Sequence, residues 1–154
     1  MKIEHAQRYR LDTRTDSYMV IGPGGVRRFT PPATQHCPKL YIVSRRGVPG
    51  YVGVTRQSIA ARIRFGLQAT GQGGYHGYRW RNQSGLDFDI WCLLGVSSDR
   101  AAAELECVEA EVVFLVRQKF KQWPKFQTEI HFHPSKQFHR DVADRILLHL
   151  IANA

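Results

Sequence analysis

The apolar positions in the middle of the chain predict a β-hairpin followed by a helix. Residues 40–43 and 51–54 are two apolar runs rich in β-branched and aromatic side chains, and turn-forming residues separate them. This pattern favours two antiparallel strands joined by a loop. Downstream, apolar side chains recur at a four-residue spacing from Ile59 to Leu67, so we expect an amphipathic helix over about residues 57–67.

The second half of the chain predicts one more strand and two helices. Residues 88–96 form a largely apolar run, which indicates a third strand of the sheet. A long amphipathic helix is expected over residues 98–122, with Pro124 closing it. A short extended segment at residues 128–132 and a closing helix over residues 138–151 complete the expected elements.

These elements predict a single α/β domain of the α+β type. We expect a small, mostly antiparallel three-stranded sheet flanked by helices, with extensions at both ends. Residues 1–38 are polar and irregular in pattern, although residues 17–21 and 26–29 flank four turn-forming residues as the strands of a short hairpin would. The predicted core spans residues 39–127, and residues 128–154 add a C-terminal strand and helix that pack on it.

Composition and charge point to a basic protein that binds a polyanion. The 154 residues include 43% hydrophobic side chains, which is enough for one compact core. Lys and Arg outnumber Asp and Glu by 22 to 13, giving a formal net charge of +9. The basic residues are spread among aromatics and glycines rather than gathered in one tail, so we expect a nucleic-acid-binding surface.

The sequence shows no segment typical of a membrane or secreted protein. No stretch approaches the roughly 18 consecutive apolar residues of a membrane span, and no apolar run follows the charged N-terminus as in a secretion signal. The three cysteines, Cys37, Cys92 and Cys107, are an odd number and form no CxxC pair, which is typical of reduced thiols. We therefore expect a cytoplasmic protein that does not bind a membrane.

The two strand-like runs carry a pair of tyrosine-containing triplets, Leu40-Tyr41-Ile42 and Tyr51-Val52-Gly53, ten residues apart. Arg62 follows in the predicted helix, and then come a third strand and a helix that bears four glutamates. This order resembles the paired signature of the GIY-YIG nuclease superfamily, and the resemblance covers roughly Lys39 to Phe126. It implies a GIY-YIG-like fold and a hydrolase that cuts phosphodiester bonds.

Four positions depart from the family pattern. Lys39 stands where the first triplet usually has a glycine, and Arg62 lies eleven rather than ten residues after Tyr51. Gly66 occupies the place of a histidine that members often carry one helical turn beyond the arginine. The family's late asparagine has no plain counterpart, and Gln127 is the candidate to supply the same amide group.

Hydrolysis of a phosphodiester requires a positioned water, an acceptor for its proton and positive charge near the phosphate. The resemblance implies that Tyr41 holds or deprotonates this water and that Tyr51 binds the phosphate or assists Tyr41. A tyrosine has a usual pKa of about 10, so it acts as a base only beside cations that lower this pKa. We expect Arg45 or Arg46, in the hairpin loop, to supply that positive charge.

Arg62 and one glutamate complete the predicted catalytic set. Arginine is permanently charged and forked, which suits a phosphate in the transition state. The four glutamates of the next helix are not separated by their spacing alone. The segment from Glu111 to Leu115 resembles the family's metal-binding pattern, so Glu111 is the expected ligand of a Mg²⁺ or Mn²⁺ ion and Glu109 is the second candidate.

Residues 70–84 predict a long glycine-rich loop with crowded aromatic and basic side chains. A loop of this length inside a compact domain is usually functional or disordered. We interpret it as a nucleic-acid contact, because arginine pairs with guanine and rings stack on or wedge between bases. The alternative for this loop is a flexible surface turn. For Arg64, in the predicted helix before the loop, the alternative to nucleic-acid contact is an ordinary solvated arginine. The side chains assigned to nucleic-acid contact are Arg45, Arg46, Arg64, Tyr75, His76, Arg79, Trp80 and Arg81.

The sequence therefore predicts a metal-dependent endonuclease that cuts DNA and leaves a 5′-phosphate and a 3′-hydroxyl, as the resemblance implies. A site-specific, restriction-type enzyme is the first hypothesis, and a homodimer would provide the two nicks of a double-strand break. The alternatives are a repair- or homing-type nuclease, a non-catalytic nucleic-acid-binding module, and a structural protein of a ribonucleoprotein. His131 and His133 share a face of an extended segment, but they lack further ligands at a suitable spacing, so we interpret them as groove or surface residues.

Overall fold

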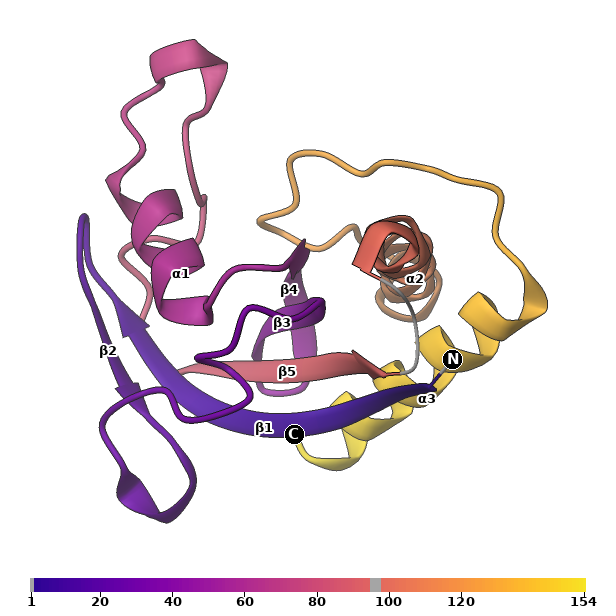
Figure 1. The fold of residues 1–154 in the computed structure, drawn as a ribbon, viewed down its shortest axis with the longest axis horizontal. Helices are drawn as coiled ribbons and strands as arrows, with labels where there is room; N and C mark the ends of the chain where they lie inside the picture. Colours follow the sequence, from indigo (N-terminus) through magenta and orange to yellow (C-terminus); the bar gives the residue numbers. More distant parts are fainter. Residues whose placement is uncertain (1, 95–97) are drawn as a thin grey trace.

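The computed structural model describes residues 2–94 and 98–154. Within them, five antiparallel strands form one sheet in the order β2-β1-β5-β3-β4, and three α-helices lie against it (Figure 1). None of these helices is long and apolar enough to cross a membrane. The elements are β1 (Lys2–Thr13), β2 (Tyr18–Ile21), β3 (Lys39–Arg45), β4 (Val48–Thr55), β5 (Leu86–Leu94), α1 (Ile59–Gln68), α2 (Ser98–Phe120), α3 (Gln137–Ala152) and two short 3-10 turns, Pro23–Gly25 and Gln72–Gly74.

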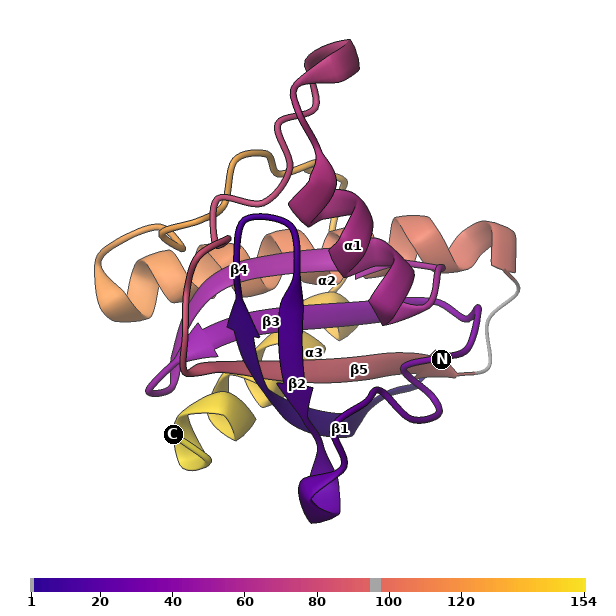
Figure 2. The same ribbon diagram turned by 90° about the vertical axis from the view of Figure 1, so that its left-hand side faces the viewer.

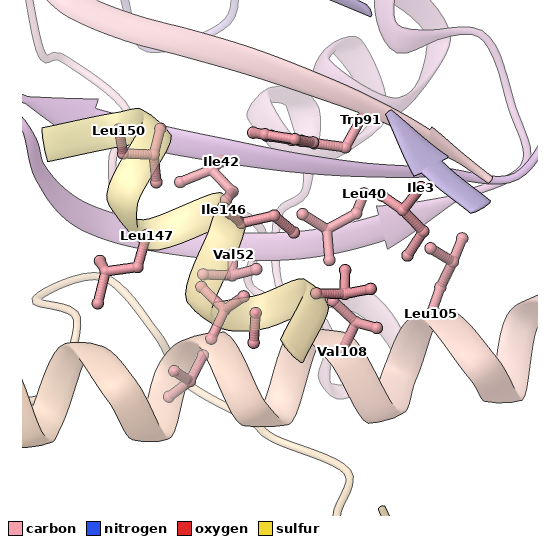
Figure 3. Packing of buried hydrophobic residues seen from close by; sticks show 14 of the residues in the cluster. Ile3, Leu40, Ile42, Val52, Trp91, Leu105, Val108, Ile146, Leu147 and Leu150 are labelled. Carbon is pink, nitrogen blue, oxygen red and sulfur yellow. The ribbon is translucent and has the colours of Figure 1, made fainter. Parts of the chain in front are cut away.

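The strands present alternate side chains to two separate cores. Figure 2 shows α1 in front of the sheet and α2 and α3 behind it. Leu40 and Ile42 of β3 belong to the core under α2 and α3, whereas Tyr41 and Val43 belong to the core under α1. In the first core, Leu40 and Ile42 lie beside Ile146 of α3 (Figure 3). Each fully buried leucine or isoleucine contributes about 1.5–3 kcal/mol, so this aliphatic layer stabilises the fold strongly.

The structure confirms the predicted hairpin and the three predicted helices. β3 and β4 pair in antiparallel register with Tyr41 opposite Gly53, and a bulge follows between Val43 and Ser44. Each α-helix begins and ends within two residues of its expected bounds. β5 is the predicted third strand, and the expected end of that strand at Val96 lies outside the described residues.

The expected three-stranded sheet is wrong, because the N-terminal segment supplies two further strands. β1 pairs with β5 along most of its length, but a bulge between His5 and Gln7 shifts the register of this pairing. Ile3 consequently belongs to the core under α2 and α3, while Tyr9 and Leu11 belong to the core under α1. In the middle of β1, residues 5–8 are all partly buried and three of them are polar, which interrupts the alternation that Ile3, Tyr9 and Leu11 show with their polar neighbours, so the pattern does not predict a strand.

Two smaller predictions are also wrong. The expected hairpin between residues 17–21 and 26–29 does not form, because β2 pairs with β1 instead. A backbone hydrogen bond from Gly22 N to Val26 O (2.8 Å) closes the intervening turn, and the chain then leaves the sheet. Residues 128–132 are irregular rather than a strand.

Candidate functional site

The tyrosines of both triplets lie in one aromatic cluster between the sheet and α1. Tyr41 is fully buried, and its ring centroid lies 5.5 Å from that of Phe88 and 5.9 Å from that of Tyr51. Gly53 lies opposite Tyr41 on β4, and a Cβ there would come within 2.6 Å of the Tyr41 hydroxyl and 2.8 Å of the Tyr51 ring. The glycine of the second triplet is therefore required for the two rings to pack together.

Tyr78, from the loop after α1, joins this cluster, although the sequence analysis did not assign it to the site. Its hydroxyl lies 2.8 Å from the hydroxyl of Tyr41, and either oxygen can be the donor. Its ring lies on Gly66 of α1, where a Cβ would be only 2.1 Å away, and it stacks on Trp80. Glycine costs about 1 kcal/mol in a helix interior, so Gly66 is the sequence signal for a ring lying on the helix.

Arg62 of α1 lies at the edge of the aromatic cluster, beside an open cleft. Its Nε donates to the hydroxyl of Tyr41 at 3.4 Å. Its guanidinium carbon lies 5.5 Å from the centre of the Tyr78 ring and 5.9 Å from the centres of the Phe65 and Tyr75 rings. These cation–π contacts hold the guanidinium in one place. The cleft has a volume of about 310 Å³ and is lined by Val54, Thr55, Arg56, Gln57, Arg62 and Phe65. None of these six lining residues is acidic, so the cleft suits an anionic group such as a phosphate.

Burial keeps both tyrosines of the triplets protonated. For Tyr41, burial and the neighbouring Tyr78 raise the pKa well above its usual value, and Arg62 offsets this only in part. Burial and the neighbouring Tyr41 likewise raise the pKa of Tyr51. At neutral pH both side chains are therefore phenols that donate or accept hydrogen bonds, and neither is a phenolate base.

The expected activation of Tyr41 by Arg45 or Arg46 does not occur. Both arginines are exposed. Arg45 donates from Nη2 to the backbone carbonyl of Ser84 at 2.7 Å, and Arg46 lies in the β3–β4 turn with a φ of 50°. Burial in the aromatic cluster has the largest effect on the pKa of Tyr41, and it raises that pKa. The sequence does not reveal this burial.

Glu109 of α2 is the glutamate whose charge acts on this cluster. Glu109 is buried, with 8% of its surface exposed. Burial, and then the charge of Glu106, raise the pKa of its carboxyl to about 8, while Arg62 lowers it. The charge of Glu109 in turn raises the pKa of Tyr51. Glu109, Arg62 and Tyr51 thus share one electrostatic environment, although they come from α2, α1 and β4.

Glu111, the expected metal ligand, lies on another side of α2. Two residues turn an α-helix by about 200°, so Glu109 and Glu111 point in different directions. The charge of Glu111 acts on Cys107, whose thiol faces the carbonyl of Pro134 in the segment before α3. The structure therefore brings the two tyrosines and the arginine together with Glu109, the second candidate, rather than with Glu111.

Two other glutamates of α2 form ion pairs with histidines. Glu104 lies 2.6 Å from His139, and Glu106 lies 2.7 Å from His133. Within the described residues, Glu109 has no such partner. A buried carboxyl without a counter-ion is costly to ionise, and a bound cation would remove that cost.

The loop after α1 contains two side chains that hold it in place. Trp80 is wholly buried and stacks on Tyr78, so its predicted contact with bases is wrong. Arg81 is bound to the protein itself and does not face outward as predicted. Its guanidinium donates to four backbone carbonyls, those of Gly66, Ala69, His76 and Tyr78.

The other predicted contact residues of this region lie at the surface. His76, Arg79 and Arg64 are exposed. The ring of Tyr75 stacks on that of Phe65 with centroids 5.1 Å apart, and Phe65 is 58% exposed. A stacked and partly exposed aromatic pair beside the cleft is suited to contact with a base.

Gln127 lies beside the edge strand β4. Its side-chain oxygen accepts from Val52 N at 2.9 Å, and its Nε2 donates to Val52 O and to Glu129 O, both at 3.0 Å. The amide group thus pairs with the backbone of β4 as a further strand would. Because both ends of the amide are engaged, Gln127 is not placed to take the role predicted for it in the cleft.

Comparisons of the chain with protein-family models, with curated proteins and with solved structures found no significant match. The fold and the site define a mixed α+β protein with a cleft, lined by Arg56 and Arg62, at the edge of an aromatic cluster. The resemblance to the GIY-YIG superfamily rests on the quoted residues alone, so the activity of the cleft is argued below as a proposal.

Proposed function

We propose that this protein is a metal-dependent endonuclease that hydrolyses phosphodiester bonds of DNA in the cleft beside Arg62. The proposal rests mainly on Glu109, a buried carboxyl with a pKa of about 8 that lies in the electrostatic field of Arg62. Active sites commonly contain ionisable groups with perturbed pKa values, set in a cleft near a charged partner. The net charge of +9 favours a polyanionic substrate.

Arg62 is the residue to which we assign the scissile phosphate. Its guanidinium stays charged and offers a forked pair of donors for the charge that develops on the phosphoryl oxygens. The rings of Phe65, Tyr75 and Tyr78 restrict its orientation, so little freedom is lost when a phosphate binds. Arg56 lines the same cleft and adds a second positive charge.

Tyr41 and Tyr51 act as neutral hydrogen-bonding groups in this proposal. Tyr41 is fully buried, accepts from Arg62 and shares a hydrogen bond with Tyr78, so its role is to position the guanidinium. Tyr51 is only partly buried, and we assign it the contact with the phosphate. This division differs from the sequence-based prediction, in which Tyr41 held or deprotonated the attacking water.

Glu109 fits the anchor of a divalent cation such as Mg²⁺ or Mn²⁺. Mg²⁺ keeps several waters and is usually bound through one or two carboxylates together with substrate phosphates, so one glutamate near a phosphate cleft is sufficient. Such an ion, when bound, acidifies a coordinated water and neutralises phosphate charge. Glu109 must lose its proton before it can bind a cation, so the metal affinity should rise as the pH rises toward 8.

Nicking of supercoiled plasmid DNA in the presence of Mg²⁺ tests the proposal. Glu109→Gln preserves the size of the side chain and removes its charge, and we expect the cleavage rate to fall about 100-fold or more. Glu111→Gln, on the same helix, is the matched control and should cut at close to the wild-type rate. Loss of cleavage in Glu111→Gln but not in Glu109→Gln would show that the assigned metal ligand is wrong.

A non-catalytic nucleic-acid-binding module is the second candidate function. The protonated tyrosines favour it, because a site in which both phenols keep their protons lacks a side chain that readily accepts one from water. Such a module would retain DNA in a gel-shift assay and would cut it with neither Mg²⁺ nor Mn²⁺. Cleavage by the wild-type protein that disappears in Glu109→Gln would exclude this candidate.

A further inference from the structure

A cluster of ionisable side chains lies on the sheet face opposite the candidate site. His5 of β1, Asp89 of β5 and His149 in the last turn of α3 form this cluster. Asp89 lies opposite Ile42 across the β3–β5 pairing, so it faces the core under α2 and α3. The cluster has no part in the proposed cleavage of DNA.

The three side chains offer ligand atoms at the spacing of a metal site. One nitrogen of each histidine and one carboxylate oxygen all lie within 4.8 Å of one another, and His5 Nε2 is 2.7 Å from Asp89 Oδ1. With these separations there is a point no farther than about 2.5 Å from any of the three atoms, against roughly 2.0–2.2 Å for zinc–nitrogen and zinc–oxygen bonds. The separations of the three atoms are therefore within a few tenths of an ångström of those that one shared zinc ion requires, and the His5 and His149 rings, with centroids 4.2 Å apart, would turn to aim both nitrogens at it.

Asp89 already has a second partner, which a metal ion need not displace. The side chain is wholly buried, and Arg8 donates from Nε to Oδ1 at 2.9 Å and from Nη2 to Oδ2 at 3.0 Å. A carboxylate offers about four lone-pair positions, so a metal ion can replace the His5 hydrogen bond at Oδ1 while Arg8 stays bound. Arg8 then holds the carboxylate in a fixed orientation, as the outer partners of metal ligands commonly do.

The ligand types favour zinc over magnesium. Two of the three candidate ligand atoms are imidazole nitrogens, and the third is a carboxylate oxygen. Imidazole nitrogens bind Zn²⁺ well, whereas Mg²⁺ prefers oxygen ligands.

We propose that His5, Asp89 and His149 bind one Zn²⁺ ion that fastens the end of α3 to β1 and β5. Two histidines and one carboxylate leave the fourth position of a tetrahedral ion to water. The three ligands are far apart in the chain, so the site exists only in the folded protein and the ion stabilises that state. This site is independent of the proposed nuclease activity.

Thermal unfolding of the metal-free full chain with added ZnCl₂ tests the proposal. At a hundredfold excess of Zn²⁺ over its dissociation constant, the Tm of the wild-type protein should rise by about 5–10 °C. His149→Ala should lose this rise. His131→Ala, which removes an exposed histidine from the segment before α3, is the matched control and should keep it. A large excess of Mg²⁺ should not displace the zinc.

Titration with Co²⁺ gives a readout that does not depend on the stability of a variant. The wild-type protein should show the visible absorption bands of a coordinated Co²⁺ ion, and His149→Ala should not. If neither ion changes the wild-type protein, or if His149→Ala responds as the wild type does, the cluster is an ion-pair network and the proposal is overturned. Glu109→Gln should bind Zn²⁺ normally, which separates this site from the proposed active site.

Discussion

The core on the sheet face under α2 and α3 has one buried aromatic ring, that of Trp91, and is otherwise aliphatic, whereas the core on the face under α1 combines aliphatic side chains with six buried aromatic rings. Leu40 and Ile146 are typical of the first face, and such side chains interdigitate without any need for hydrogen bonds. Tyr41 and Tyr78 are typical of the second, and their buried hydroxyls need polar partners. They find these partners in each other and in Arg62. The second face therefore contains a polar network that ends at a cleft.

The aromatic face also contains features that lower stability. Gly53 and Gly66 leave out side chains so that rings can approach the backbone. Glu109, which comes from α2 on the other side of the sheet, acts on this face through its charge, and it is a buried carboxyl without a counter-ion among the described residues. Natural proteins depart from locally favourable choices mainly at functional sites. The comparison of the two faces thus locates the function on the α1 side, and the predictions below are designed to test that location.

The largest effect is expected from Arg62→Lys. Lysine keeps the positive charge but loses the forked donors and the flat surface that lies over Tyr78. We expect plasmid nicking to slow about 1000-fold, with only a small change in Tm. Arg64→Lys is the matched control, because Arg64 is exposed on the same helix, and it should cut at close to the wild-type rate. An equal loss in both variants would mean that α1 contributes general positive charge instead of a defined site.

The second prediction concerns the stability of Glu109→Gln as a function of pH. The pKa of Glu109 in the folded protein is about 8, against a usual value of 4.5. The folded protein therefore holds a proton that the unfolded chain releases between these pH values. As a result, the free energy of unfolding falls as the pH rises from 4.5 to 8, and it stays lowered above 8. Glutamine does not ionise, so at pH 8 the variant should be more stable than the wild type by about 4 kcal/mol.

Urea unfolding at pH 5 and pH 8 measures this difference. At pH 5 the stabilities of the variant and of the wild type should differ by less than about 1 kcal/mol, because this pH is only slightly above the usual pKa of 4.5 at which the unfolded carboxyl titrates. Glu111→Gln should show no comparable dependence on pH. If Glu109→Gln is more stable than the wild type and no longer cuts DNA, Glu109 is a residue that lowers stability and is kept for function. An equal stability of variant and wild type at pH 8 would contradict the assignment.

Most of the fold could be predicted because most elements carry one continuous periodicity. The two hairpin strands, the third strand and the helices each show a single apolar stripe or run. β1 could not be predicted, because its partly buried and mostly polar middle, residues 5–8, interrupts the alternation of apolar and polar side chains. Its other signal, the pairing of its arginines with aspartates on β5, exists only after the sheet has formed.

The site residues that follow from their spacing along the chain, Tyr41, Tyr51 and Arg62, could be predicted. The residues that join the site through tertiary packing could not. Glu109 and Glu111 both border the apolar stripe of α2, and only the position of the helix against β4 separates them. Tyr78 and Trp80 lie in a loop whose path over Gly66 is a tertiary feature. The sequence therefore assigned the loop's rings to bases, although Trp80 belongs to the core.

The smallest effect is expected from Tyr78→Phe, for which Tyr9→Phe on the same face is the matched control. Each change removes one hydroxyl from a buried ring, since the Tyr78 hydroxyl lies 2.8 Å from that of Tyr41 and the Tyr9 hydroxyl donates to Gln7 at 2.7 Å. The Tyr9 hydroxyl also lies 3.2 Å from Thr30 Oγ1 and accepts from Thr30 N at 3.2 Å. Loss of one hydrogen bond costs about 1 kcal/mol, so Tyr9→Phe should lose at least as much stability in urea as Tyr78→Phe. Only Tyr78→Phe removes a partner of Tyr41, which positions Arg62, so only this variant should cut more slowly, by about tenfold. If Tyr78→Phe and Tyr9→Phe cut DNA at the same rate, the buried hydroxyls under α1 contribute to stability alone, and the polar network on this face has no part in cleavage.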